Sequence, residues 1–230
     1  MANKNVKVDL NEPDQLQTMT ERLLEYVMER KTYFIAAGSV ILGAIIIVLG
    51  VYLYSMNYES NAEEVYAKAF NTYSFADVNN GMESDALKNA VVLYEELGRD
   101  YPRSDAAALS FYNLGNIFFN IGEMDKAIEA YKSFIKKSPR NSVLTSLAYY
   151  GLGYCYEKKD DYAQSLESFR QSDENLKGKH FKAINYSNIA RIYEKMDEPE
   201  KALEYYRKVL EYTEDPFMNV LVKGKIAALG

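Results

Sequence analysis

The sequence contains few of the residues from which most catalytic and metal sites are built. Its 230 residues include a single cysteine, Cys155, a single histidine, His180, and no tryptophan. One cysteine excludes an intrachain disulfide, and the spacing of paired zinc ligands is missing. No nucleophile and base stand in a recognisable dyad, and no glycine-rich phosphate loop or calcium loop is present. The sequence therefore predicts no enzyme and no cofactor or metal site.

Positive charge is not in excess either. The chain carries 27 Lys and Arg against 33 Asp and Glu, a net charge of -6 at pH 7. The two signs are interspersed along residues 57–230. A nucleic-acid-binding surface needs a basic face, so we expect no nucleic-acid partner.

What the chain does contain is one long apolar run, from Tyr33 to Tyr54, without a charged residue. As a helix at 1.5 Å per residue this run would be about 33 Å long, enough for a hydrocarbon core of about 30 Å. It is longer than the apolar region of a cleavable signal peptide, although Ser60-Asn61-Ala62 offers a possible cleavage site. We therefore predict a transmembrane signal anchor over residues 33–54.

The charges beside this run predict its orientation. Arg22, Arg30 and Lys31 lie close before the run, whereas only Lys68 lies close after it. Cytoplasmic flanks carry the excess of Lys and Arg. We therefore expect a single-pass protein of a bacterial inner membrane, with its N-terminus in the cytoplasm and the rest in the periplasm.

Residues 1–32 are then a cytoplasmic tail. Within it, Pro13 to Arg30 has apolar residues on one side of a 3.6-residue helix, so an amphipathic helix is predicted. This helix either lies in the membrane interface or docks onto a membrane partner.

Three copies of one motif follow the apolar run, each with the same internal spacing. A copy consists of an aromatic residue, Leu or Ile with a small residue, a second aromatic, and then a small residue and an aromatic on the next helix. The copies are Phe111, Leu114-Gly115, Phe118, Ala127 and Tyr131; Tyr149, Leu152-Gly153, Tyr156, Ser165 and Phe169; and Tyr186, Ile189-Ala190, Tyr193, Ala202 and Tyr206. Repetition at this period predicts a solenoid, in which helix pairs bury their apolar faces by stacking.

The motif resembles the tetratricopeptide repeat (TPR), a helix, a short turn and a second helix with small residues where the helices touch. The copies recur after 38 and 37 residues, whereas the family period is 34. The extra residues fall between repeats, after Pro139 and in the stretch from Asn175 to His180, where added length has little cost. The resemblance implies an all-α fold, a TPR-like helical-hairpin solenoid that follows one transmembrane helix.

The expected TPR domain covers residues 55–230. In a degenerate first repeat, Ala90, Tyr94 and Pro102 stand at the spacing of later motif residues, and Asn79-Asn80-Gly81 predicts a loop. The expected segments are a degenerate repeat at about 61–103, repeats at about 108–141, 146–179 and 183–216, and a capping helix at 217–229.

The concave surface of such an array is lined by the face of each first helix that points away from its partner helix. Counting from the motif places the following residues on that face: Leu109, Tyr112, Asn113, Asn116 and Phe119; Leu147, Tyr150 and Tyr154; and Ile184, Ser187, Asn188 and Arg191. From these we predict a groove for a peptide or protein, formed by Leu109, Tyr112, Asn113, Asn116, Tyr150, Tyr154, Asn188 and Arg191.

Asparagine can pair with both N–H and C=O groups of an extended peptide, and tyrosine adds apolar contact with a polar tip. Packing between helices is the alternative role for these tyrosines. Family members that hold an acidic C-terminus use two or more Lys or Arg, whereas Arg191 is the only cation on this lining.

The layout resembles the ancillary subunits of the bacterial SecYEG translocon, with a short cytoplasmic segment, one span and a periplasmic TPR domain. That resemblance implies a membrane-anchored adaptor or scaffold for protein–protein interactions, with translocon subunits or periplasmic chaperones as partners. The alternative is a structural subunit of a cell-envelope assembly, such as secretion, pilus or outer-membrane biogenesis machinery. The partner and the oligomeric state are left open by the sequence.

Overall fold

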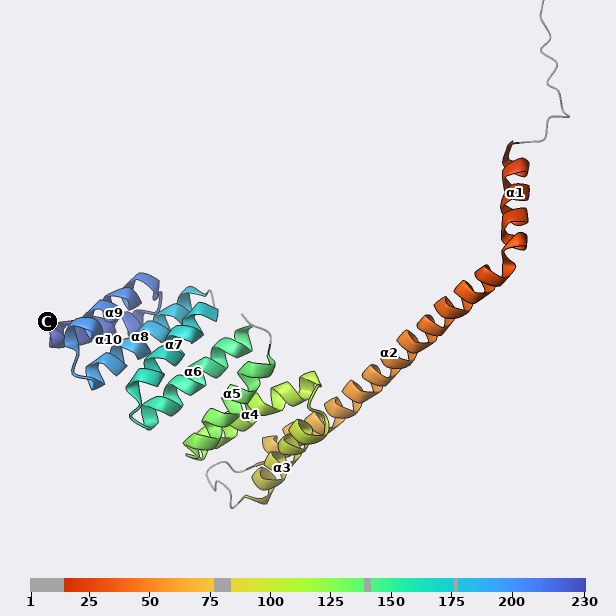
Figure 1. Ribbon diagram of the computed structural model, residues 1–230. Helices are drawn as coiled ribbons and strands as arrows, with labels where there is room; N and C mark the ends of the chain where they lie inside the picture. The colour runs from red at the N-terminus through yellow and green to blue at the C-terminus, as the bar shows by residue number, and fades with distance from the viewer. Residues whose placement is uncertain (1–14, 77–83, 139–141, 176–177) are drawn as a thin grey trace, which may run out of the picture. The chain divides into compact units, whose positions relative to one another are not determined.

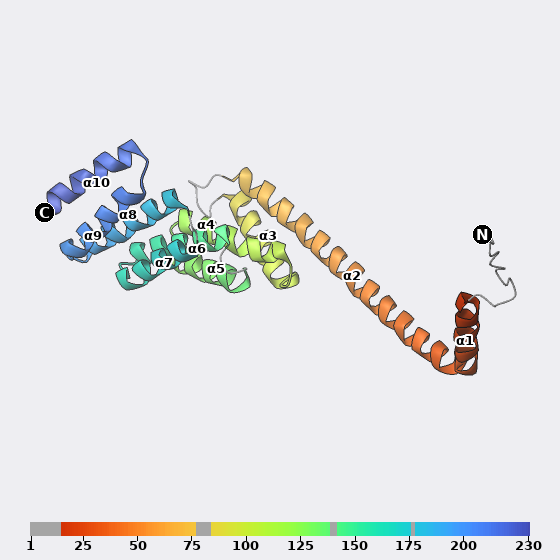
Figure 2. The ribbon, with the colours of Figure 1, turned by 90° about the horizontal axis from the view of Figure 1, so that it is seen from above.

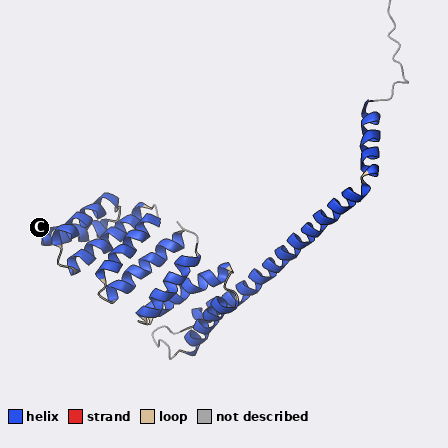
Figure 3. Ribbon diagram, in the orientation of Figure 1, coloured by secondary structure: helices blue, strands red, loops and turns tan. Residues whose placement is uncertain are grey.

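The structure, a computed structural model, describes residues 15–76, 84–138, 142–175 and 178–230 (Figure 1). Within these ranges all regular elements are α-helices and no strand is present (Figure 3), which confirms the predicted all-α class. The loop predicted at Asn79-Asn80-Gly81 and the connection at Pro139 lie outside the described residues.

The chain divides into two compact units, residues 1–56 and 57–230. In the first unit, α1 (Gln15–Glu29) is followed by the start of α2, which runs from Lys31 to Ser74. Among the described residues, α2 is the one helix long and apolar enough to cross a membrane. None of its most apolar stretch is buried. A helix that is apolar on all sides needs an apolar environment around it.

The second unit contains the end of α2 and a row of helix pairs. Figures 1 and 2 show the pairs α4/α5, α6/α7 and α8/α9 following one another, with α10 beside α9. The bounds of these helices are α3 (Asp85–Asp100), α4 (Asp105–Asn120), α5 (Met124–Lys137), α6 (Val143–Lys158), α7 (Tyr162–Asn175), α8 (Lys179–Lys195), α9 (Pro199–Tyr212) and α10 (Pro216–Leu229).

The same turn closes the three pairs. Gly122, Asp160 and Asp197 each stand seven residues after the small motif residue and have positive φ angles of 85°, 57° and 58°. Glycine adopts this region freely and aspartate tolerates it. One residue later, the backbone N–H donates to a carbonyl five residues back, as in Glu123 to Phe118 at 2.8 Å. This is the Schellman pattern that ends a helix.

The motif's small residues allow the two helices of a pair to approach closely. A Cβ atom added at Gly115 would lie 2.5 Å from the ring of Tyr131, and one at Gly153 would lie 2.6 Å from Phe169. Both rings are buried. The motif therefore forms the contact between first and second helices.

The end of α2 packs with α3 and α4. The rings of Tyr66 and Tyr94 lie 5.8 Å apart. The Glu59 carboxylate accepts hydrogen bonds from the backbone N–H groups of Asp105 at 3.0 Å and Ala106 at 3.3 Å. These two N–H groups are free of intrahelical partners at a helix start. Glu59 thus caps α4 from another helix.

Cys155 is completely buried in α6, and burial raises the pKa of its thiol to about 12. Because the thiolate is the reactive form, we expect iodoacetamide at pH 8 to alkylate the folded protein at least about 100-fold more slowly than the protein in guanidinium. Mass spectrometry over a time course measures both rates. Equal rates would contradict the described burial.

Candidate functional site

A groove of about 440 Å³ lies between two neighbouring helix pairs. It combines aromatic rings, one leucine, one amide and one glycine. Its lining residues are Tyr112, Asn116 and Phe119 of α4, Tyr131 of α5, and Leu147, Tyr150, Gly151 and Tyr154 of α6. We call this set the α4–α6 groove.

Four of the eight residues predicted from the sequence, Tyr112, Asn116, Tyr150 and Tyr154, come together in the α4–α6 groove. Leu109 and Asn113 do not line it. Leu109 packs against the core of the first repeats, and the Asn113 amide donates to the Tyr66 hydroxyl at 2.8 Å. Both side chains serve the contact with preceding helices.

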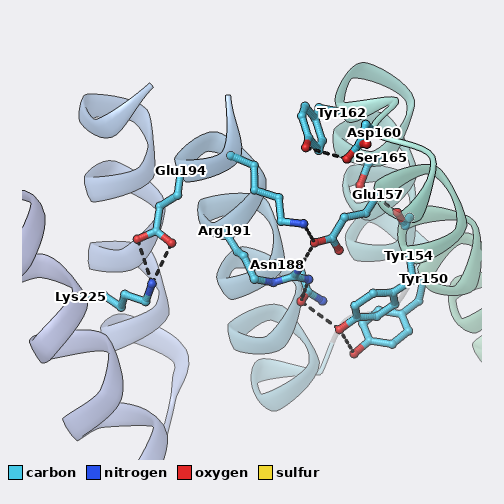
Figure 4. Close-up of polar contacts among 12 residues, drawn as sticks. Tyr150, Tyr154, Glu157, Asp160, Tyr162, Ser165, Asn188, Arg191, Glu194 and Lys225 are labelled. Carbon is cyan, nitrogen blue, oxygen red and sulfur yellow. Dashed lines mark hydrogen bonds and ion pairs between the residues drawn. The ribbon is translucent and has the colours of Figure 1, made fainter. Parts of the chain in front are cut away.

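The structure corrects the predicted position of Asn188, which the sequence placed on the groove surface. The residue is 6% exposed. Its Oδ1 atom accepts hydrogen bonds from the Tyr154 hydroxyl and from Nη2 of Arg191, both at 3.0 Å. The Asn188 side chain therefore joins α8 to Tyr154 of α6 (Figure 4).

The two groove tyrosines of α6 are held in place by this network. The hydroxyl groups of Tyr150 and Tyr154 lie 3.0 Å apart, and Tyr150 also contacts Phe181 of α8, with ring centroids 5.7 Å apart. Burial raises the pKa of Tyr154 above its ordinary value, so its hydroxyl keeps the proton that it donates to Asn188. Contacts with α8 of the next repeat thus hold Tyr150 and Tyr154 in position.

Arg191, the only cation of the predicted lining, is paired internally. It forms an ion pair with Glu157, whose side chain is 7% exposed, and Lys195 Nζ lies 3.0 Å from the same carboxylate oxygen. The Arg191 guanidinium also lies 5.5 Å from the ring centre of Tyr154. Because the Arg191 guanidinium is already engaged by Glu157, it is poorly placed to hold the carboxylate of a bound C-terminus.

Glu157 was not among the site residues predicted from the sequence, although its spacing from the motif could have indicated it. It stands four residues after Gly153, and Arg191 stands one residue after Ala190. The same two motif positions meet one repeat earlier, where Phe119 contacts Tyr154 at 6.4 Å between ring centres. Glu194, four residues after Ala190, pairs with Lys225 of α10 at 2.9 Å (Figure 4). One contact rule therefore links successive repeats.

Gly151 and Asn116 of the groove lining both contact Tyr131. A Cβ atom added at Gly151 would lie 2.6 Å from the ring of Tyr131, so any side chain here would displace that ring. The Tyr131 hydroxyl donates to Oδ1 of Asn116 at 2.7 Å. This bond uses the oxygen of Asn116 and leaves its amide hydrogens to other acceptors.

Comparison with known proteins supports the repeat architecture. Family models described as tetratricopeptide repeat match residues 109–141 and 144–215. Tetratricopeptide repeat protein 21A of Mus musculus is 27% identical over 111 residues, which are 48% of this chain. The chain spans only 8% of the length of that mouse protein.

Solved structures share the fold at low identity. A crystal structure of MamA protein has a TM-score of 0.53 and 18% identity, covering 75% of this chain and 86% of MamA. BtubC from P. vanneervenii has a TM-score of 0.56 and 18% identity, covering 77% of this chain and 75% of BtubC. The matches confirm the predicted TPR-like solenoid.

Proposed function

Because residues 109–141 and 144–215 carry tetratricopeptide repeats, which support a role in protein–protein interaction, we propose that the chain is a membrane-anchored adaptor. The apolar part of α2 lies in the inner membrane of a bacterium, and the repeats work on the periplasmic side. The α4–α6 groove receives an extended segment of a protein partner. The partner class is a translocon subunit or a periplasmic chaperone.

The composition of the groove carries this proposal. Aromatic rings and Leu147 offer apolar contact, and the amide hydrogens of Asn116 can donate to a peptide carbonyl. The pairing of Arg191 with Glu157 disfavours an acidic C-terminus as the ligand. An internal, extended segment with apolar side chains fits these features best.

The Asn116→Asp variant tests the groove. Aspartate keeps the acceptor for Tyr131 but lacks the amide donor and adds negative charge, so we expect capture of partners to fall about tenfold. A photo-crosslinking amino acid at Leu147, in native membranes, would measure capture by mass spectrometry. Val143→Ser, an exposed position at the start of α6 outside the groove lining, is the control. An unchanged partner set in Asn116→Asp would refute the groove assignment.

The anchor is tested separately. We expect alkaline phosphatase fused at Gly230 to be active and a fluorescent protein that fails to mature in the periplasm to stay dark. Alkaline carbonate should leave the chain in the membrane pellet, whereas a variant lacking residues 33–54 should move to the supernatant, because the span supplies the apolar anchoring area. If the reporters fused at Gly230 were found in the cytoplasm, the proposed orientation and compartment would be wrong.

The alternative, a permanent subunit of an envelope assembly, is favoured by one observation. Phe217 and Val220 of α10 are large apolar side chains that face solvent, and contiguous exposed apolar area marks interaction sites. Co-purification in a fixed stoichiometry that survives Asn116→Asp would support this alternative.

A further inference from the structure

A second groove, of about 310 Å³, lies over α6 between the second helices α5 and α7. Its floor is formed by the motif residues Tyr149, Leu152 and Tyr156 of α6. Lys132 and Lys136 of α5 stand on one wall, and Ser168 of α7 stands on the other. We call this set the α5–α7 groove. It shares no lining residue with the α4–α6 groove.

The last repeat shows which side chain fits this groove. Tyr186, Tyr193 and Tyr205 stand 37 residues after Tyr149, Tyr156 and Ser168, at the same positions of the motif. The ring of Tyr205 lies 5.9 Å from that of Tyr186 and 5.6 Å from that of Tyr193, measured between centroids. In the last repeat a tyrosine ring of the chain itself therefore packs against the two wall aromatics, whereas the short side chain of Ser168 leaves the corresponding space open.

Cations surround the ring that fills the last repeat. Lys208 Nζ lies 4.4 Å from the ring centre of Tyr205, and Nη2 of Arg170 donates to the Tyr193 hydroxyl at 2.8 Å. Lys132 directly follows Tyr131 as Arg170 follows Phe169, and its Nζ atom lies 5.5 Å from the ring centre of Tyr156. An aromatic side chain that entered the α5–α7 groove would thus also find a cation beside it, which attracts the face of a ring.

The charge of the α5–α7 groove is not balanced from within. Among the described residues, neither Lys132 nor Lys136 forms an ion pair. The one carboxylate of the lining, Glu167, accepts a hydrogen bond from Gln171 at 3.0 Å. Two positive charges therefore stand against one negative charge, and this balance favours an anionic ligand.

The equivalent groove one repeat earlier has the opposite charge. It measures about 330 Å³ and has Ala130 at the position of Ser168. Glu95 takes the place of Lys132, and Glu129 also lines the groove. The two grooves are similar in size and in their apolar floor, so charge is what distinguishes their ligands.

We propose that the α5–α7 groove binds a segment of a partner protein in which an aromatic side chain is flanked by aspartate or glutamate. The ring fills the space beside Ser168, as Tyr205 does in the last repeat, and the flanking carboxylates pair with Lys132 and Lys136. Aromatic side chains that fill a pocket are frequent anchors of interfaces. The repeats then have a second binding face, independent of the α4–α6 groove.

A blocked pentapeptide with 3-fluorotyrosine at its centre and two acidic residues on each side is a suitable probe. Fluorine NMR with the full chain in nanodiscs of zwitterionic lipid should show line broadening and a Kd of about 1 mM or below. Ser168→Tyr, which fills the groove as Tyr205 does, should weaken binding at least about tenfold. Ala130→Tyr makes the same change in the acidic groove and should leave binding unchanged. Circular dichroism checks that both variants are folded.

Charge reversal is an independent test, because Lys132 and Lys136 are both exposed. The double variant Lys132→Glu with Lys136→Glu should weaken binding about tenfold. An unlabelled peptide with tyrosine should displace the probe, whereas one with alanine at the same place should not.

The proposal would be overturned if the probe showed no broadening at about 5 mM, or if either the charge reversal or Ser168→Tyr left its binding unchanged. Weaker binding in Ala130→Tyr alone would move the site to the acidic groove and would also contradict it. Sedimentation of the chain in detergent separates the remaining case: a dimer that Ser168→Tyr dissociates would assign the groove to a second copy in place of a partner.

Discussion

Replacing Gly115 by leucine is expected to lower the free energy of unfolding of the repeats by about 3 kcal/mol, because it overpacks a core contact. The first added atom alone would stand 2.5 Å from Tyr131. That ring cannot retreat, because Gly151 of the next repeat lies against its other part, where an added Cβ would be 2.6 Å away. The clash therefore spreads across two repeats.

Urea unfolding of the full chain in detergent, followed by circular dichroism, measures this loss. Gly224→Leu is the matched control, since it makes the same substitution in a helix where no atom lies within 4 Å of the new Cβ. Leucine is a better helix former than glycine, so this control should be as stable as the parent chain or more stable by about 0.5–1 kcal/mol. If both variants lowered the free energy of unfolding by similar amounts, the cause would be the replacement of a glycine inside a helix and not the contact with Tyr131.

Replacing Arg191 by methionine is expected to lower the free energy of unfolding by about 2 kcal/mol. Glu157 is nearly buried and would keep only Lys195 as a counter-ion. Breaking a fully buried pair costs about 3–5 kcal/mol, and the partial exposure of Arg191 and Lys195 reduces that figure. The same change removes one of the two donors to Asn188 and the cation over Tyr154.

The double variant Glu157→Leu with Arg191→Met should recover at least half of that loss, since it removes the unpaired carboxylate together with its partner. A double-mutant cycle by urea unfolding gives the coupling energy. Lys208→Met is the surface control: Lys208 pairs with exposed Glu204 at 2.6 Å on α9, and such pairs are worth about 0.3–0.5 kcal/mol. Equal costs for Arg191→Met and Lys208→Met would show that Glu157 is effectively hydrated.

The fold class was predictable because the residues that form the contact within each pair repeat along the sequence. Gly115 and Gly153 must be small where Tyr131 and Phe169 cross them, and that requirement is visible as a motif. The turns were equally legible, since their length is the same in every pair. Local requirements that recur in each repeat leave a clear signal.

The candidate site was less predictable because it depends on contacts between repeats. Asn188 faces the groove by helical counting, yet Tyr154 and Arg191 reach it from the side and cover it. Gly151 has no place in the motif, because the ring that passes over it belongs to the preceding repeat. Whether Tyr112, Asn116, Tyr150 and Tyr154 bind a partner stays a prediction.

The three recurring turns at Gly122, Asp160 and Asp197 also bear on how the chain folds. Each turn joins helices that touch within about 30 residues of sequence, so most native contacts are local and folding should be fast. Hairpins of this kind can nucleate independently and then propagate to their neighbours. With the proposed topology, a chain emerging on the periplasmic side would close α4 onto α5 before α6 has crossed the membrane, and each finished hairpin would offer the next one a folded surface.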